Sequence, residues 1–146
     1  MPYQRSVLSL DEAHKAMDRM LQEAFKAPDR PVAIAICDDQ GELVTFARMD
    51  KCAPLPLIIA RKKAFTAART RADTKAFAER LKSMGRSVSD LGEPNLLPVQ
   101  GGVAIIAADG SPLGGIGVSG LAAEEDEAIA RIGLGVIVPQ MNATSR

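Results

Sequence analysis

The chain has 146 residues, of which 47% are hydrophobic and 25% charged, a composition typical of one soluble globular domain. Its 18 Lys and Arg residues balance its 18 Asp and Glu residues, so no basic excess is left to neutralise a nucleic-acid backbone. Four phenylalanines, one tyrosine and no tryptophan offer few aromatic faces on which bases could stack. We therefore expect a single domain over residues 1–146 and no nucleic-acid partner.

Targeting and membrane signals are missing from the sequence. Residues 1–5 lead directly into a polar helix-capping signal, without the apolar run of a signal peptide, and no membrane segment is visible. The two cysteines, Cys37 and Cys52, match no metal-binding or redox spacing, and reduced thiols are typical of the cytosol. No neighbouring histidine lowers the pKa of Cys52, so we interpret it as structural. We expect a cytoplasmic protein with no membrane partner.

Hydrophobic periodicity and turn residues divide the chain into eight elements. Ser9 and Glu12 have the spacing of a capping box, which predicts the start of the first helix, and Pro28 ends it. Asp38 to Gly41 and Gly110 to Pro112 are typical of the turns that join two strands of a hairpin. In chain order we predict a helix, two strands, two helices, two strands and a helix over residues 9–28, 31–37, 42–48, 57–71, 74–84, 103–109, 113–118 and 121–136.

The order α-β-β-α-α-β-β-α predicts an α/β fold of the α+β type. Adjacent hairpins indicate an antiparallel sheet, because parallel pairing would need a crossover after every strand. The apolar runs of the strands are continuous rather than alternating, which favours helices on both faces of that sheet. Residues 85–101 contain two prolines and no clear periodicity, and a connection of this length usually has a functional task.

A glycine motif lies between the last strand and the last helix. Gly115, Gly117 and Gly120 match the spacing G-x-G-x-x-G of dinucleotide-binding proteins. Four carboxylates at residues 124–127 then occupy the helix start, where a pyrophosphate would need positive charge. We therefore favour a packing role, in which the glycines let a helix or a neighbouring subunit approach the strand closely.

His14 is the one histidine, which excludes His-containing catalytic triads and multi-histidine metal sites. It shares a helical stripe with Leu10, Met17 and Leu21, so we expect it to be buried or interfacial. Two roles remain open for it, a hydrogen-bonded packing residue or a single axial ligand to a haem iron.

Basic residues cluster at the start of the second predicted helix. This cluster forms either a solvated basic face or part of a site, and it consists of Arg61, Lys62 and Lys63. Lys63 shares its face with two threonines, and a partly buried lysine can bind a carboxylate or act as a base when its pKa is lowered. The sequence alone leaves both interpretations open.

Five motifs in a fixed order give the chain a family resemblance. Together they resemble the GlcG/HbpS family, which includes the C-terminal domain of PduO, and the resemblance extends from Ser9 to Gly135. The motifs are Arg48-Met49-Asp50, Ala60 to Ala67, Gly101-Gly102-Val103, Gly115 to Gly120, and Glu124 to Ala128.

The resemblance implies a profilin-like fold, with an antiparallel sheet covered by helices, and homo-oligomers from dimers to octamers. Some members of the family bind haem through a histidine of the helical N-terminal region, and one branch is linked to haem degradation and redox sensing. In this chain His14 is the imidazole that could serve as the haem ligand. The first hypothesis is therefore a haem-binding protein of haem handling or redox response, with no metal site built from side chains alone.

Two further hypotheses follow from the same resemblance. The family motif marks Arg48, Asp50, Lys63 and Asp126 as polar groups that converge near the sheet edge. A lyase, isomerase or hydratase would then hold a small carboxylate substrate through Arg48, with Lys63 as base or oxyanion stabiliser and Asp126 orienting it. The third hypothesis is a non-catalytic oligomer whose motif residues form the subunit contact. Whether the protein is an enzyme stays open at this point.

Overall fold

The first helix begins at the predicted capping box. In the computed structural model, which describes residues 1–139, the Glu12 amide donates to the Ser9 hydroxyl over 3.1 Å, and the Glu12 carboxylate accepts from the Ser9 amide over 3.5 Å. These bonds satisfy two amides that a helix start leaves without partners. Helix α1 spans Leu10–Ala24 and ends four residues before the predicted boundary at Pro28, with Phe25 as its C-cap.

All eight predicted elements are present, and one short helical turn is added. The chain forms α1 (Leu10–Ala24), β1 (Ala33–Asp38), β2 (Leu43–Arg48), α2 (Pro54–Thr70), α3 (Thr74–Ser83), η1 (Val88–Leu91), β3 (Gly102–Ile106), β4 (Pro112–Ser119) and α4 (Ala123–Ile137). The four strands pair in the order β2-β1-β4-β3, and every pairing is antiparallel. None of the helices described for residues 1–139 combines the length and hydrophobicity that crossing a bilayer requires.

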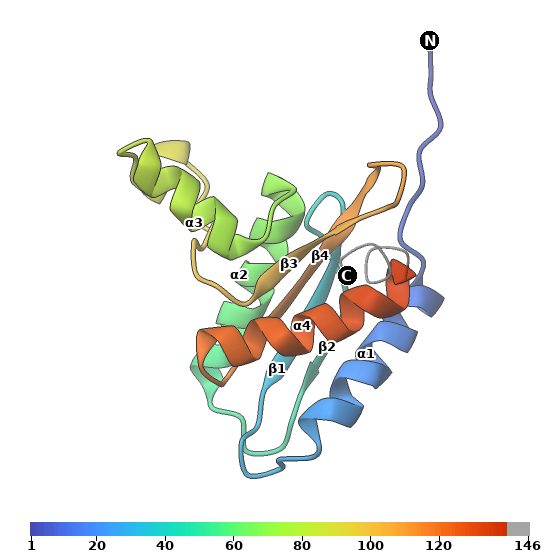
Figure 1. The fold of residues 1–146 in the computed structure, drawn as a ribbon, viewed down its shortest axis with the longest axis vertical. Coiled ribbons are helices and arrows are strands. Elements are labelled where there is room, and N and C mark those ends of the chain that lie inside the picture. The colour runs from blue at the N-terminus through green and yellow to red at the C-terminus, as the bar shows by residue number, and fades with distance from the viewer. Residues whose placement is uncertain (140–146) are drawn as a thin grey trace.

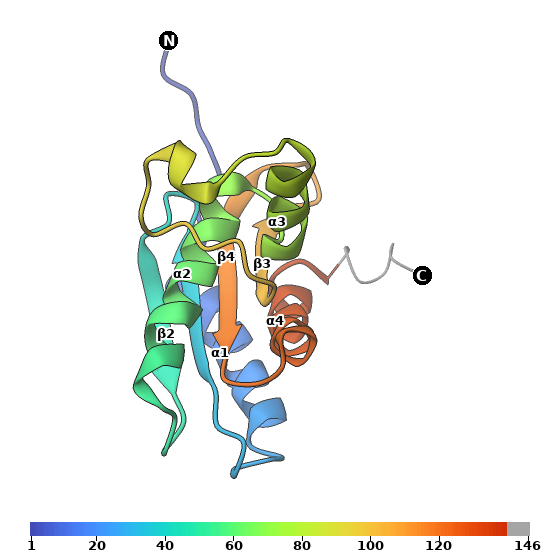
Figure 2. The ribbon, with the colours of Figure 1, turned by 90° about the vertical axis from the view of Figure 1, so that its left-hand side faces the viewer.

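Helices cover both faces of the sheet, as the continuous apolar strands predict. Helices α1 and α4 lie side by side across one face, and α2 lies on the other (Figure 1; Figure 2). Side chains alternate along β1, so Ile34 and Ile36 join the core under α1 and α4, whereas Ala33 and Ala35 face α2. The first core holds most of the large apolar side chains, among them Met20, Ile116 and Val118.

Helix α2 lies unusually close to β4 because both contribute small residues. A Cβ added at Gly117 would stand 2.1 Å from the Ala60 carbonyl oxygen, and one added at Gly115 would stand 2.4 Å from that of Ala64. No side chain fits between the two backbones at these positions. The glycines of the predicted motif therefore serve close packing within the chain, and α2 occupies the space beside them.

The long segment before β3 is tied to α2 and α3. It contains the short helix η1 and then runs back along α2, where the Leu97 amide donates to the Thr66 hydroxyl over 2.8 Å. At its end the Gly102 amide donates to the Thr74 hydroxyl over 2.9 Å. Figure 2 shows this segment crossing in front of the sheet beside α2. The segment is thus held at a defined place next to the helix.

Candidate functional site

Lys63 and Asp126 form a buried ion pair between α2 and α4. The Lys63 ammonium lies 3.0 Å from Asp126 Oδ2 and donates to the Val118 carbonyl oxygen of β4 over 2.8 Å. The other Asp126 oxygen accepts from the Leu121 amide over 3.0 Å, just before α4 begins. One ion pair therefore joins a helix on each face of the sheet to the central strand between them.

The surroundings seal this pair from solvent. Both side chains are only 3% exposed, and a Cβ added at Gly101 would stand 2.4 Å from the Lys63 nitrogen. Burial raises the pKa of the Asp126 carboxyl above its ordinary value, while the Lys63 charge and the hydrogen bonds from Lys63 and Leu121 oppose that rise. The Lys63 ammonium therefore binds groups of the fold itself, and almost none of its surface is accessible to a substrate.

The four polar groups marked by the family motif reach the same end of the sheet, but only two of them meet. Arg48 pairs in register with Ala33, which in turn pairs with Ser119, the residue after Val118. Arg48 nevertheless stands on the edge strand β2, and both it and Asp50 are exposed. Within residues 1–139 neither of them forms an ion pair. The structure brings Lys63 and Asp126 together and leaves Arg48 and Asp50 free in solvent.

His14 is exposed in the first half of α1, so of the two predicted environments the buried one is wrong, whereas an interfacial position stays a prediction. The helix packs on the core through the neighbouring face, which consists of alanines and methionines, namely Ala13, Ala16, Met17, Met20 and Ala24. Leu10, one turn before His14, is 54% exposed. An exposed imidazole beside an exposed leucine is open to a ligand or to another molecule.

An apolar pocket of about 410 Å³ lies between the C-terminal end of α1 and the first half of α4. Its walls include Val32, Ile129 and Ile132. At its rim the Arg30 guanidinium makes two hydrogen bonds of 2.9 Å to the Glu125 carboxylate. His14 does not line this pocket, and nor does any methionine, cysteine or tyrosine that could bind a haem iron.

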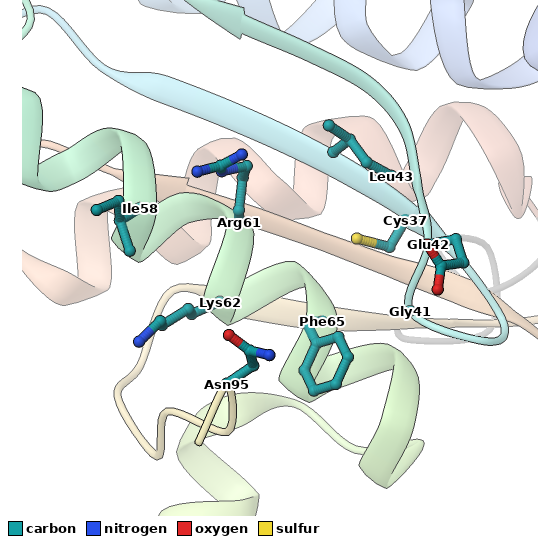
Figure 3. A pocket seen from close by; sticks show the side chains of 9 residues that line it. All are labelled: Cys37, Gly41, Glu42, Leu43, Ile58, Arg61, Lys62, Phe65 and Asn95. Carbon is teal, nitrogen blue, oxygen red and sulfur yellow. The ribbon is translucent and has the colours of Figure 1, made fainter. Parts of the chain in front are cut away.

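A second pocket, of about 330 Å³, lies between the β1–β2 hairpin, the outer side of α2 and the segment before β3 (Figure 3). We call it the hairpin pocket. Its lining consists of Cys37, Gly41, Glu42, Leu43, Ile58, Arg61, Lys62, Phe65 and Asn95. Arg61 and Lys62 are recognisable in the sequence as part of a cationic cluster, whereas Glu42 and Asn95 come from distant segments and carry no local signal.

The cysteines and acidic residues form no further centre in the part of the chain that the structure describes. Over residues 1–139 no three His, Cys, Asp or Glu side chains gather as metal ligands would. Cys37 and Cys52 are both free thiols. Burial raises the pKa of Cys37 to about 12 and also raises that of Cys52, so neither thiol is activated as a nucleophile.

Comparisons with known proteins agree with the family resemblance. The family model described as "Haem degrading protein HbpS-like" matches residues 8–135. Protein GlcG of Escherichia coli K12 is 39% identical over 98 residues, which are 67% of this chain and 71% of that protein.

Solved structures show the same fold. A double mutant of HbpS from Streptomyces reticuli is 33% identical with a TM-score of 0.82, over 93% of this chain and 90% of that one. The PduOC:Heme complex is 25% identical with a TM-score of 0.80, over 90% of this chain and 96% of that one. With the family model matching most of its length, this chain belongs to the HbpS-like family.

Proposed function

We propose that this protein is a cytoplasmic, homo-oligomeric haem-binding protein of haem handling or redox response, with His14 as the axial ligand of the iron. The observation that carries the proposal is the exposed imidazole of His14 on α1, beside the exposed side chain of Leu10. Neutral imidazole is a common axial ligand of haem iron. The matched family is described as haem-degrading, and one related structure is a haem complex, which supports the same assignment.

The residues fit a haem in part. His14 supplies an accessible nitrogen, but the apolar pocket begins at Glu23, nine residues further along α1 and thus about 14 Å away at the helical rise of 1.5 Å per residue. The faces of a porphyrin are large and apolar and need cover from water. A porphyrin at His14 therefore needs a second copy of the chain to cover it, and for this reason we include a homo-oligomer in the proposal.

Bound iron would supply the redox chemistry, and the chain would hold and orient it. The side chain of His14 would hold the group at α1, and Leu10 would offer apolar contact one turn away. No acid or base of the chain is assigned to a reaction step.

A haem titration followed by absorption spectroscopy tests the proposal. Wild-type protein should give a saturable Soret shift near one haem per subunit or per dimer, and His14→Ala should abolish it. Gln22→Ala, a change at another exposed position of α1, is the matched control and should titrate like the wild type. An unchanged spectrum in His14→Ala would reject this ligand, and a featureless wild-type titration would reject haem binding.

The need for a second copy has its own readout. Sizing of the haem-loaded protein should show an assembly of at least two chains. A fully loaded monomer would show that the porphyrin needs no cover from another subunit.

A further inference from the structure

The hairpin pocket carries positive charge that the rest of the described chain does not neutralise. Arg61 and Lys62 both line it, and within residues 1–139 neither side chain forms an ion pair or hydrogen bond with a carboxylate. The side-chain amide of Asn95 reaches the same pocket without a hydrogen bond to a described residue, and Figure 3 shows it close to Lys62. Cationic and amide donors are the groups that bind a carboxylate.

The other walls of the hairpin pocket are apolar or acidic. Leu43 on β2 and Ile58 on α2 are both exposed apolar side chains at its lining. Glu42 lies in the hairpin turn, at the far side from Lys62 and Asn95 in Figure 3. Its carboxylate pairs with no cation among residues 1–139, so it is available to accept a hydrogen bond from a ligand.

The aromatic wall of the pocket is braced by the hairpin. The Arg69 guanidinium lies 5.0 Å from the centre of the Phe65 ring and donates to the Gln40 carbonyl over 2.8 Å. At Gly41, where φ is +86°, an added Cβ would stand 2.7 Å from the Phe65 ring. The hairpin turn therefore packs directly against the Phe65 ring and fixes its position.

The Asn95 wall is braced by α2. Two residues after Asn95, the Leu97 amide donates to Thr66, whose hydroxyl donates to the Lys62 carbonyl over 2.7 Å. The segment that brings Asn95 to the pocket is thus fastened to the same turn of α2 that carries Lys62. A pocket whose walls are already placed loses less entropy on binding a ligand.

We propose that the hairpin pocket binds a small organic carboxylate, held by Lys62 and Asn95, with a short apolar chain against Leu43 and Ile58 and with Arg61 adding positive charge at the lining. Glu42 favours ligands that carry a hydroxyl group at the end opposite to the carboxylate, because its own carboxylate then accepts a hydrogen bond. The volume of about 330 Å³ lies at the lower end for small-molecule sites and suits a ligand of a few carbon atoms. Cys37 stays a neutral thiol at the wall, so binding is reversible and forms no covalent bond.

Calorimetric titration with three probes of similar size tests the proposal. Butyrate and 4-hydroxybutyrate, whose hydroxyl lies at the end opposite to the carboxylate, should bind saturably, with a dissociation constant of ~10 mM or tighter for ligands of so few atoms. Butylamine, which reverses the charge, should not bind. The double variant Arg61→Gln/Lys62→Met should weaken butyrate at least tenfold, whereas Arg19→Gln, an exposed cation of α1 outside the pocket, should leave it unchanged.

The Glu42→Gln variant tests the predicted selectivity. It should keep its affinity for butyrate and lose the preference for 4-hydroxybutyrate. Equal weakening by Arg19→Gln, equal binding of butylamine, or no saturable binding to the wild type would each overturn the proposal. A change of oligomer size in the double variant without any butyrate binding would identify the surface as a contact between copies, and would overturn it too.

This site is independent of the proposed haem site. Arg61→Gln/Lys62→Met should leave the Soret titration unchanged, and His14→Ala should leave butyrate binding unchanged. Loss of butyrate binding therefore does not count against haem binding, and loss of haem binding does not count against butyrate binding.

Discussion

On one face of the sheet α1 and α4 pack through large apolar side chains, whereas on the other face α2 rests directly on the backbone of β4. The first contact contains Met17, Met20 and Ile116. The second is made largely by alanines and glycines, and its buried residues are Ala33, Ala35, Cys37, Ala60, Ala64 and Ala68. The first face can adjust by moving flexible side chains, but at Gly115 and Gly117 the second is a contact of backbone with backbone.

The two faces of the sheet also differ in the polar side chains that their helices carry. The close approach of α2 brings Lys63 through to Asp126 and Val118, and it leaves Arg61 and Lys62 on the outer side of the helix at the hairpin pocket. The pocket beside α1 and α4 is lined mainly by apolar groups. Helix α2 thus combines a contact of backbone with backbone on its inner side with a pocket that carries charged side chains on its outer side.

The largest expected effect is at Gly117. Gly117→Ala places a methyl group where the Ala60 carbonyl oxygen would be 2.1 Å away and the Ala64 nitrogen 2.5 Å away. Because both neighbours are helix backbone, α2 must shift as a whole, and we expect a loss of more than about 4 kcal/mol in the free energy of unfolding. Urea unfolding followed by circular dichroism measures it. A loss below about 1 kcal/mol would show that α2 does not rest on β4 as described.

The next largest effect is at the buried ion pair. Lys63→Met leaves the Asp126 carboxylate buried without its partner, and removing one member of such a pair typically costs about 3–5 kcal/mol. The double variant Lys63→Met/Asp126→Asn has no buried charge and retains an acceptor for the Leu121 amide. It should be more stable than Lys63→Met alone, as measured by a double-mutant cycle in urea. Additive losses would show that the two groups are not coupled.

Unfolding of Lys63→Met should also depend on pH. Burial raises the pKa of Asp126 in the folded protein above its ordinary value of 3.8, and the loss of Lys63 raises it further. The folded state then retains a proton that the unfolded state releases. The stabilisation is therefore fully present below pH 3.8 and is lost as the pH rises through the folded pKa, by at most about 1.4 kcal/mol per pH unit.

Urea midpoints between pH 4 and 7 measure this slope, and the double variant Lys63→Met/Asp126→Asn is the control, since it lacks the titrating carboxyl. A stability of Lys63→Met that rises with pH would contradict the assignment of the shift to burial of Asp126.

The element order and the two covered faces could be predicted because they depend on local patterns. Capping at Ser9, turn residues and continuous apolar strands all act within a few residues of one another. The orientation of α1 was harder to predict. Of the stripe Leu10, His14, Met17 and Leu21, Met17 is buried and Leu21 packs against the core, whereas Leu10 and His14 are exposed. The buried face is centred on small alanines, which contribute little to a hydrophobic pattern.

The sites depend on residues far apart in the chain. Only the family resemblance suggested that Lys63 and Asp126 act together, because no periodicity relates a helix on one face to a helix on the other. The hairpin pocket takes Glu42, Arg61 and Asn95 from three segments, so no local motif describes it. Its signals in the sequence are the cations Arg61 and Lys62 and the length of the connection over residues 85–101, which does bring Asn95 to α2.

The smallest expected effect on stability is at Gly133, on the face of the sheet opposite to α2. Gly133 lies within α4, and a Cβ added there would stand 2.6 Å from the sulfur and 2.7 Å from the terminal carbon of Met20. These atoms are the end of a flexible side chain, so Met20 can move where the backbone of α2 cannot. Replacing a helical glycine by alanine gains about 1 kcal/mol, which offsets much of the cost of the crowding. We expect Gly133→Ala to change the free energy of unfolding by less than about 1 kcal/mol in the same urea experiment, and a loss as large as that of Gly117→Ala would mean that both faces are equally rigid.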